Sequence, residues 1–281
     1  MFMKQLTMTG NLLKGLALAA VLAGCQQEDV VTQSPSPGVT ANDNHAKIAF
    51  TPQLLKEDAN QLEYFGDYDV NRGKLKKLTN NDEGYYTEYQ YSGQTIVAQR
   101  RKISTNSLSY QVTYQLDGSG RCVESLSTET NKTLKYEYSQ TGRLTKIYNK
   151  AAPNERMEFT YESNALTLLK TISFFNQANA ATKEISYGYM VQGGTGMENK
   201  YPVNPTALGI TSRFLPLFGA FQAQLPTYES TKMLPWNGAA YPTYSLTYAF
   251  NANGFPKTIT ANSSMGGVPL VTNRTYTTPG L

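Results

Sequence analysis

The sequence predicts an all-β protein: an antiparallel meander of successive hairpins forming one large curved sheet, open or barrel-like, with a short partly helical insertion. The alternative is a β-sandwich. Apolar and aromatic residues recur at every second position, a polar turn with glycine or asparagine follows each run, and 20 tyrosines and 11 phenylalanines accompany one tryptophan. Period-two alternation is typical of strands with one buried face, and aromatic residues favour strands.

Three hairpins share one spacing, in which a glycine lies four residues after the last alternating apolar residue. The pairs are Leu116 with Gly120, Tyr138 with Gly142, and Phe250 with Gly254. Looser copies place the turn residue at Gly73, Gly93 and Asn164. Glycine and asparagine tolerate the positive φ angles that hairpin turns and adjacent bulges need. Each copy therefore predicts a turn between two antiparallel strands.

The hairpins follow one another at regular intervals. Their turn residues at 73, 93, 120, 142 and 164 are separated by 20, 27, 22 and 22 residues, which is one hairpin per interval. A lone hairpin is marginally stable in water, so these units are expected to pair edge to edge. The strand after each turn begins alike, and Cys122 occupies the position of Leu144. We therefore expect Cys122 to be a small buried residue rather than a reactive thiol.

The N-terminus has the features of a secretory signal peptide. Residues 1–24 carry Lys4 and Lys14 and no acidic residue, and an apolar run at 15–23 precedes Cys25. Nine residues of helix rise only ~14 Å against ~30 Å of hydrocarbon, so the run is a cleaved targeting segment. Leu-Ala-Gly-Cys at 22–25 matches the bacterial lipobox, which predicts lipidation of Cys25. Two or three acyl chains make such anchoring to a membrane stable.

A flexible tether is predicted over residues 25–46, which are polar, rich in proline and serine, and without apolar periodicity. A single all-β domain is expected over 47–281. The four residues after Cys25, Gln-Gln-Glu-Asp, resemble the acidic export signal of Bacteroidota lipoproteins. That resemblance implies an outer-membrane lipoprotein exposed at the cell surface.

The hairpin pattern is interrupted at residues 192–240. The stretch 208–225 is apolar with helix-like spacing, but Gly209, Pro216 and Gly219 exclude one long helix. One interpretation is a plug that covers apolar surface of the sheet, which the high apolar content favours. The other is a binding site, because insertions in repeat proteins often carry function. Its candidate ligand-binding aromatic residues are Tyr201, Tyr228, Trp236 and Tyr241.

Charge and composition disfavour several classes of function. Cleavage of the predicted signal peptide removes Lys4 and Lys14 and leaves 23 basic and 21 acidic residues. This near balance of charge does not indicate a surface that binds nucleic acid. The only histidine, His45, lies in the tether, which argues against Ser-His-Asp catalysis and histidine-ligated zinc. A calcium-like run at 67–73 has its glycine one place late and is better explained as a hairpin turn. We expect no metal, no cofactor and no catalytic residue.

The repeat resembles the tyrosine-aspartate repeats of Rhs-type proteins, whose units also read aromatic-x-aromatic, polar turn, Gly-Arg-Leu. The run from Tyr138 to Leu144 is the most similar copy. Together with the lipobox, the chain is still more similar to Bacteroidota lipoproteins of unknown function that are built of such hairpins. Most turns here lack the Tyr-Asp pair and the repeats are few, so the resemblance does not imply encapsulation of a toxin.

Three hypotheses for function follow. The first is a membrane-anchored, surface-exposed, non-catalytic module that binds a glycan or a protein. The alternative is a structural or assembly component of the cell envelope whose sheet edges pair with another protein. The least favoured is a carboxylate-based hydrolase, which needs two acidic residues about 5 to 10 Å apart in a cleft.

Overall fold

The computed structural model describes residues 52–162, 167–189, 196–235, 238 and 240–277. The chain divides into two units, 1–48 and 49–281, and every described residue belongs to the second. The predicted signal peptide, Cys25 and the tether at 25–46 lie outside the described residues.

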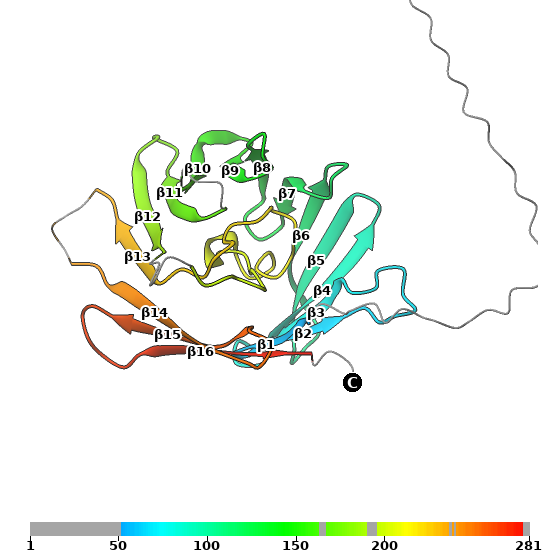
Figure 1. Ribbon diagram of the computed structural model, residues 1–281. Coiled ribbons are helices and arrows are strands. Elements are labelled where there is room, and N and C mark those ends of the chain that lie inside the picture. The colour runs from blue at the N-terminus through cyan, green and yellow to red at the C-terminus, as the bar shows by residue number, and fades with distance from the viewer. Residues whose placement is uncertain (1–51, 163–166, 190–195, 236–237, 239, 278–281) are drawn as a thin grey trace, which may run out of the picture. The chain divides into compact units, whose positions relative to one another are not determined.

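Sixteen antiparallel strands form a closed barrel (Figure 1). Each strand pairs with its neighbours in the chain, and β16 pairs with β1 to close the ring. The predicted all-β meander of hairpins is confirmed, and its sheet is a closed barrel rather than a sandwich. The strands are β1 Leu54–Glu57, β2 Asn60–Tyr64, β3 Leu75–Asn80, β4 Tyr85–Ser92, β5 Thr95–Lys102, β6 Leu108–Leu116, β7 Cys122–Ser127, β8 Lys132–Tyr138, β9 Leu144–Asn149, β10 Ala152–Tyr161, β11 Leu169–Phe175, β12 Ala181–Gly188, β13 Tyr228–Met233, β14 Thr243–Phe250, β15 Pro256–Ser263 and β16 Leu270–Tyr276.

The hairpin turns owe their shape to an acceptor at the first position and a glycine at the fourth. Asp117 Oδ1 accepts the backbone N–H of Ser119 and of Arg121, both at 2.9 Å, and Gly120 has φ +79°. Asn251 and Gly254 repeat this arrangement. The positive φ explains why glycine is required there. Asn164, the remaining predicted turn residue, lies outside the described residues.

A contact that we call the tyrosine clamp explains the sequence repeat. The guanidinium carbon of Arg121 lies 5.0 Å from the centre of the Tyr138 ring, and the Tyr138 hydroxyl donates a 2.7 Å hydrogen bond to the Cys122 carbonyl oxygen. Each clamp thus links the end of one strand to the first residue of the paired strand before it in the chain. Three further clamps pair Lys74 and Leu75 with Tyr91, Arg143 and Leu144 with Tyr161, and Phe255 and Pro256 with Tyr276.

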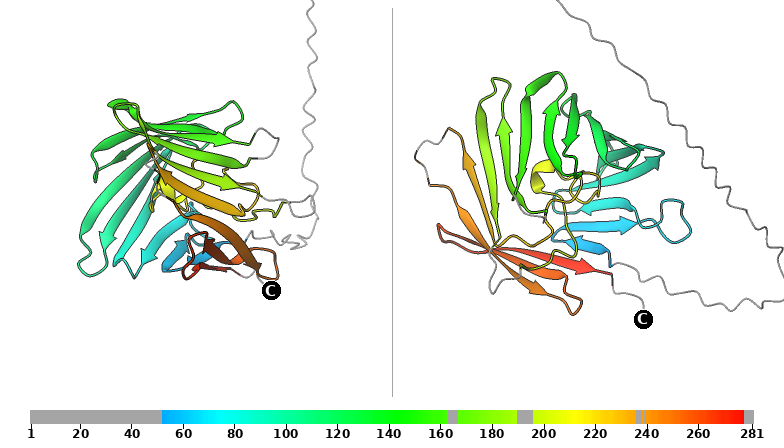
Figure 2. Two further views of the ribbon diagram at one scale, coloured as in Figure 1. Left: turned by 90° about the vertical axis from the view of Figure 1, so that its left-hand side faces the viewer. Right: turned by 45° about the horizontal axis from the view of Figure 1, so that its top comes forward.

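The barrel interior holds an inner segment, residues 196–226, which joins β12 to β13 (Figure 2). Its one short helical turn is η2, Thr206–Leu208. Phe218, 1% exposed, contacts the rings of Tyr114 and Tyr136 on the wall. Each such fully buried side chain contributes about 2 to 3 kcal/mol through burial. This packing is that of a plug. The main cluster of buried residues runs from Leu54 to Phe221 in the sequence, and Leu225 and Phe255 are buried as well.

Cys122 is fully buried in this core, at the position of Leu144 in the neighbouring repeat. Burial raises the pKa of its thiol to about 12. The thiolate, which is the reactive form, is therefore strongly disfavoured in the folded protein.

Many outward positions on strands β4 to β9 of the barrel wall are polar. Lys135 on β8 forms an ion pair with Glu124 on β7, and Gln99 Nε2 donates to Gln111 Oε1 at 3.1 Å across β5 and β6. Further polar residues at outward positions of β4 to β9 are Glu88, Gln90, Thr95, Thr113, Glu137 and Thr145, whereas Val97 and Leu126 are apolar outward residues. Among the described residues, no helix combines the length and apolar character that a membrane span requires.

Candidate functional site

A cavity of about 780 Å³ lies inside the barrel, between the ends of strands β2 to β6 and the inner segment. That volume is within the range of roughly 300 to 1,000 Å³ typical of small-molecule sites. The wall contributes Tyr64, Gly73, Lys74, Leu75, Tyr91, Gly93, Ile96, Leu116 and Gly120, and the inner segment contributes residues 200–204, 213–217 and 219–221. Most of this lining is aliphatic or aromatic.

The tyrosines of the lining offer ring faces more than hydroxyls, because the hydroxyls are already bonded. The Tyr64 hydroxyl donates to the Leu54 carbonyl oxygen at 2.8 Å and lies 3.1 Å from the Tyr201 hydroxyl. The Tyr91 hydroxyl donates to the Leu75 carbonyl oxygen at 2.8 Å. Burial raises the pKa of Tyr64 and of Tyr91 far above the ordinary value of 10.0, so both are neutral. Around Tyr64 and Tyr91 the cavity therefore presents mainly apolar surface.

Two lysines stand at the edge of this apolar surface. Lys74 Nζ lies 3.0 Å from Asn71 Oδ1 and 4.9 Å from the centre of the Tyr91 ring. Lys200 Nζ donates to the Asn253 carbonyl oxygen at 3.1 Å. Both side chains are exposed, and neither forms an ion pair with a carboxylate in the described part of the chain. Their charges are thus free to attract an anion.

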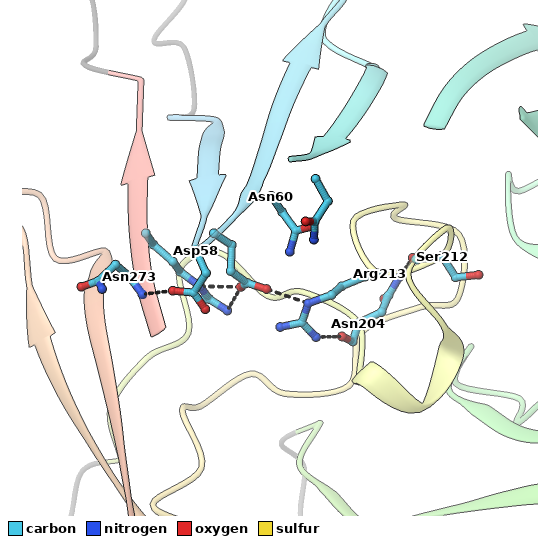
Figure 3. A network of polar contacts seen from close by, with 9 residues as sticks. Asp58, Asn60, Asn204, Ser212, Arg213 and Asn273 are labelled. Atoms are coloured by element: carbon cyan, nitrogen blue, oxygen red, sulfur yellow. Dashed lines mark hydrogen bonds and ion pairs between the residues drawn. The ribbon is translucent and has the colours of Figure 1, made fainter. Parts of the chain in front are cut away.

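The third cation of the lining, Arg213, belongs to a buried network in which it shares the Glu57 carboxylate with Arg274 (Figure 3). Arg213 Nε donates to Glu57 Oε1 at 2.7 Å, and Arg274 Nε donates to Glu57 Oε2 at 2.9 Å. Burial acts to raise the pKa of Glu57, but the two guanidinium groups outweigh it and hold the pKa below 4.5. Glu229 forms no ion pair within the part of the chain that the structure describes, and burial raises its pKa. The network joins β1, β16 and the inner segment where the barrel closes.

Further hydrogen bonds fix the inner segment against the wall. Asn204 Nδ2 donates to the carbonyl oxygens of Ser212 and Leu215, both at 2.7 Å. The Tyr114 hydroxyl lies 2.9 Å from Ser212 Oγ, and the Tyr89 hydroxyl donates to the Thr211 carbonyl oxygen at 3.1 Å. Figure 3 shows Asn204 and Ser212 beside Arg213 on the same segment. The cavity is consequently bounded by ordered backbone on its inner side.

The aromatic residues predicted from the sequence do not gather at one place. Tyr201 lines the cavity, and its ring contacts Tyr276 at 5.8 Å between centres. Tyr228 lies on β13, packed beside Gly188, and Tyr241 is half-buried just before β14. Trp236 lies outside the described residues.

Sequence reasoning missed the charged residues of this region. The run that begins at Lys74 reads as a solvated strand face, and Glu57 and Arg274 stand at opposite ends of the domain. One available signal was the position directly after the turn glycine. Lys74 occupies the place that Arg121 and Arg143 hold in other repeats, and turns of successive hairpins collect at one end of a barrel.

The calcium-like loop is a hairpin turn in the structure. Asp69 Oδ1 accepts the backbone N–H of Asn71 at 2.7 Å, and Asp67 forms an ion pair with Arg72. In the described ranges, no cluster of three or more His, Cys, Asp or Glu side chains could hold a metal ion. The described residues that line the cavity include no Asp or Glu.

Solved structures share this fold, two porin-like proteins among them. One is a porin-like protein from Bacteroides uniformis, with a TM-score of 0.53, 13% identity, and coverage of 80% of this chain and 93% of that one. The other is a porin-like protein from Bacteroides vulgatus, with a TM-score of 0.52, 17% identity, and coverage of 80% and 98%. No known protein family matches the sequence. No curated protein matches it either.

Proposed function

We propose that this chain is a cell-envelope lipoprotein, anchored through Cys25, whose barrel binds a small ligand in the interior cavity without catalysing a reaction on it. The observation that carries the proposal is the cavity of about 780 Å³, with apolar walls and two lysines at its edge. The similarity in fold to porin-like proteins from Bacteroides supports an envelope location. The sequence left a glycan or a protein open as the ligand, and the enclosed apolar lining favours a small molecule with an apolar body.

The alternative functions have less support. Assembly through sheet edges needs an unpaired edge strand, whereas each described strand is hydrogen-bonded on both sides in the closed ring. A carboxylate-based hydrolase needs a pair of acidic residues in the cleft, and the described lining holds none. Conduction through the barrel would require an open lumen, and the inner segment fills much of it.

The test uses a neutral apolar dye, phenylnaphthylamine, with the 47–281 domain, which contains the complete barrel and core. Ala220 lines the cavity and is exposed, so Ala220→Trp fills the cavity without disturbing the core. We expect the wild type and the control Ala220→Ser to bind the dye, and Ala220→Trp to lose binding while its melting temperature stays unchanged. Equal binding by all three proteins, or by none, would contradict a ligand site in this cavity.

A further inference from the structure

We infer that the ligand is a single-chain anionic amphiphile, such as a long-chain carboxylate, taken up from the membrane to which the protein is anchored. This inference rests on the proposed function and specifies the ligand class of the same cavity. Three features carry it: the composition of the cavity walls, the charge at the cavity edge, and an exposed apolar loop beside the cavity lining.

The apolar walls of the cavity favour a ligand with an apolar body. Leu75, Ile96, Leu215 and Leu217 are buried residues of the lining, and they leave no side-chain hydrogen-bonding group on those surfaces. The hydroxyls of the lining tyrosines are committed to backbone and to one another. A ligand rich in hydroxyl groups would lose hydrogen bonds to water on entry, whereas an alkyl chain gains from leaving water.

The cationic side chains at the edge of the cavity favour an anionic head group. The Lys74 ammonium contacts the side-chain oxygen of Asn71 and the Tyr91 ring, and the Lys200 ammonium contacts the Asn253 carbonyl oxygen, all neutral groups. Arg213 shares the single Glu57 carboxylate with Arg274, so these two cations and one anion keep a net positive charge. The described lining contains Lys74, Lys200 and Arg213 and no Asp or Glu, and this excess of positive charge favours a carboxylate or phosphate over a neutral or cationic head.

An exposed apolar loop beside the cavity indicates the source of the ligand. Gln53, at the start of the barrel, donates from Nε2 to the carbonyl oxygen of Gly73, a residue of the cavity lining, at 3.2 Å. The loop that ends at Gly73 therefore lies beside the cavity lining and the first described residues of the barrel. The loop before Gly73 carries two fully exposed apolar side chains, Tyr68 at 104% and Val70 at 95%. Tyrosine and aliphatic side chains of this kind favour a membrane interface.

The test measures displacement of phenylnaphthylamine by dodecanoate, dodecanol and dodecyltrimethylammonium, each below its micellar concentration. We expect dodecanoate to displace the dye most strongly. The double substitution Lys74→Gln with Lys200→Gln should weaken the affinity for dodecanoate roughly fivefold to thirtyfold, because it removes two partly exposed ion pairs with the carboxylate. Dodecanol displacement should change less than about twofold. The control, Lys56→Gln with Lys170→Gln, removes two exposed lysines that do not line the cavity and should have no effect.

These measurements distinguish a preference for an anionic head group from ligand binding in the cavity as such. Equal displacement by all three amphiphiles would overturn the anionic head group while leaving ligand binding in the cavity intact. Dye binding that survives Ala220→Trp would overturn the cavity function itself. For the source, we expect Tyr68→Ser with Val70→Ser to slow uptake of dodecanoate from phosphatidylglycerol vesicles severalfold without changing its affinity in solution. An unchanged uptake rate would overturn the membrane source.

Discussion

Glu57→Gln is predicted to destabilise the barrel strongly. The Glu57 side chain is 4% exposed and its partners Arg274 and Arg213 are 5% and 17% exposed, so the substitution leaves two cations in the interior without their counter-ion. Breaking a buried ion pair in this way costs about 3 to 5 kcal/mol. For a domain of more than 200 residues, that loss lowers the melting temperature by about 6 to 20 °C. Urea unfolding followed by circular dichroism measures the free energy directly.

The matched control for this substitution is Asp67→Asn, which breaks an ion pair with Arg72 between side chains that are 43% and 63% exposed. Exposed pairs are worth about 1 kcal/mol or less, so its effect should be small. Replacing the triad of Glu57, Arg213 and Arg274 together by leucine and methionine should recover much of the stability, because no unpaired charge remains. A free energy of unfolding for Glu57→Gln within about 1 kcal/mol of the wild type would refute the role of the network.

The same network predicts the direction of acid sensitivity. The pKa of Glu57 in the folded protein lies below the ordinary 4.5 of the unfolded chain, so its contribution to stability is complete above about pH 4.5. The contribution is lost as the pH falls through the folded-state pKa. The difference in stability between wild type and Glu57→Gln should therefore shrink between pH 5 and pH 3, as measured by urea unfolding at each pH. A constant difference would contradict this linkage.

Three further predictions concern single side chains. Tyr161→Phe removes the hydroxyl that donates to the carbonyl oxygen of buried Leu144, so the free energy of unfolding measured in urea should fall by about 1 kcal/mol. The control is Tyr148→Phe, because the Tyr148 hydroxyl has no hydrogen bond among the described residues. Its free energy of unfolding should fall by less than about 0.5 kcal/mol. Burial raises the pKa of Glu229, so its ionised form weakens the fold as the pH rises, and Glu229→Gln should raise the melting temperature at pH 8 but not at pH 4. Cys122, with a pKa of about 12, should react with iodoacetamide at pH 8 only after unfolding, and reaction of the native barrel at the unfolded rate would contradict its burial.

The fold was predictable because it rests on local patterns. The spacing of Leu116 to Gly120 and of Tyr138 to Gly142 specifies a turn with positive φ, and the structure has both turns. The equivalence of Cys122 and Leu144 identified a core position from register alone. Closure of the ring was left open, because it depends on the cumulative twist and stagger of all strands and on the pairing of the first with the last.

The site was less predictable because it depends on contacts between distant residues. Glu57 and Arg274 are 217 positions apart, and no local pattern connects them. Lys74 follows the repeat, yet its place at the cavity edge depends on where the inner segment runs. The tyrosines of the repeat were recognised, but their hydroxyls are used in clamps such as that of Tyr138, which leaves the rings of Tyr64, Tyr91 and Tyr201 to line the cavity.

The pairing of β1 with β16 has a consequence for the order of folding. Gln53 and Thr277 exchange hydrogen bonds across 224 positions, so the ring closes only after the last strand has been synthesised. In chain order the wall of β1 to β12 comes first, the inner segment follows, and β13 to β16 then enclose it. The inner segment can therefore pack against an incomplete barrel and does not need to pass through a closed one. Such long-range closure makes folding slow, and until the last strand arrives two strand edges stay exposed to other chains.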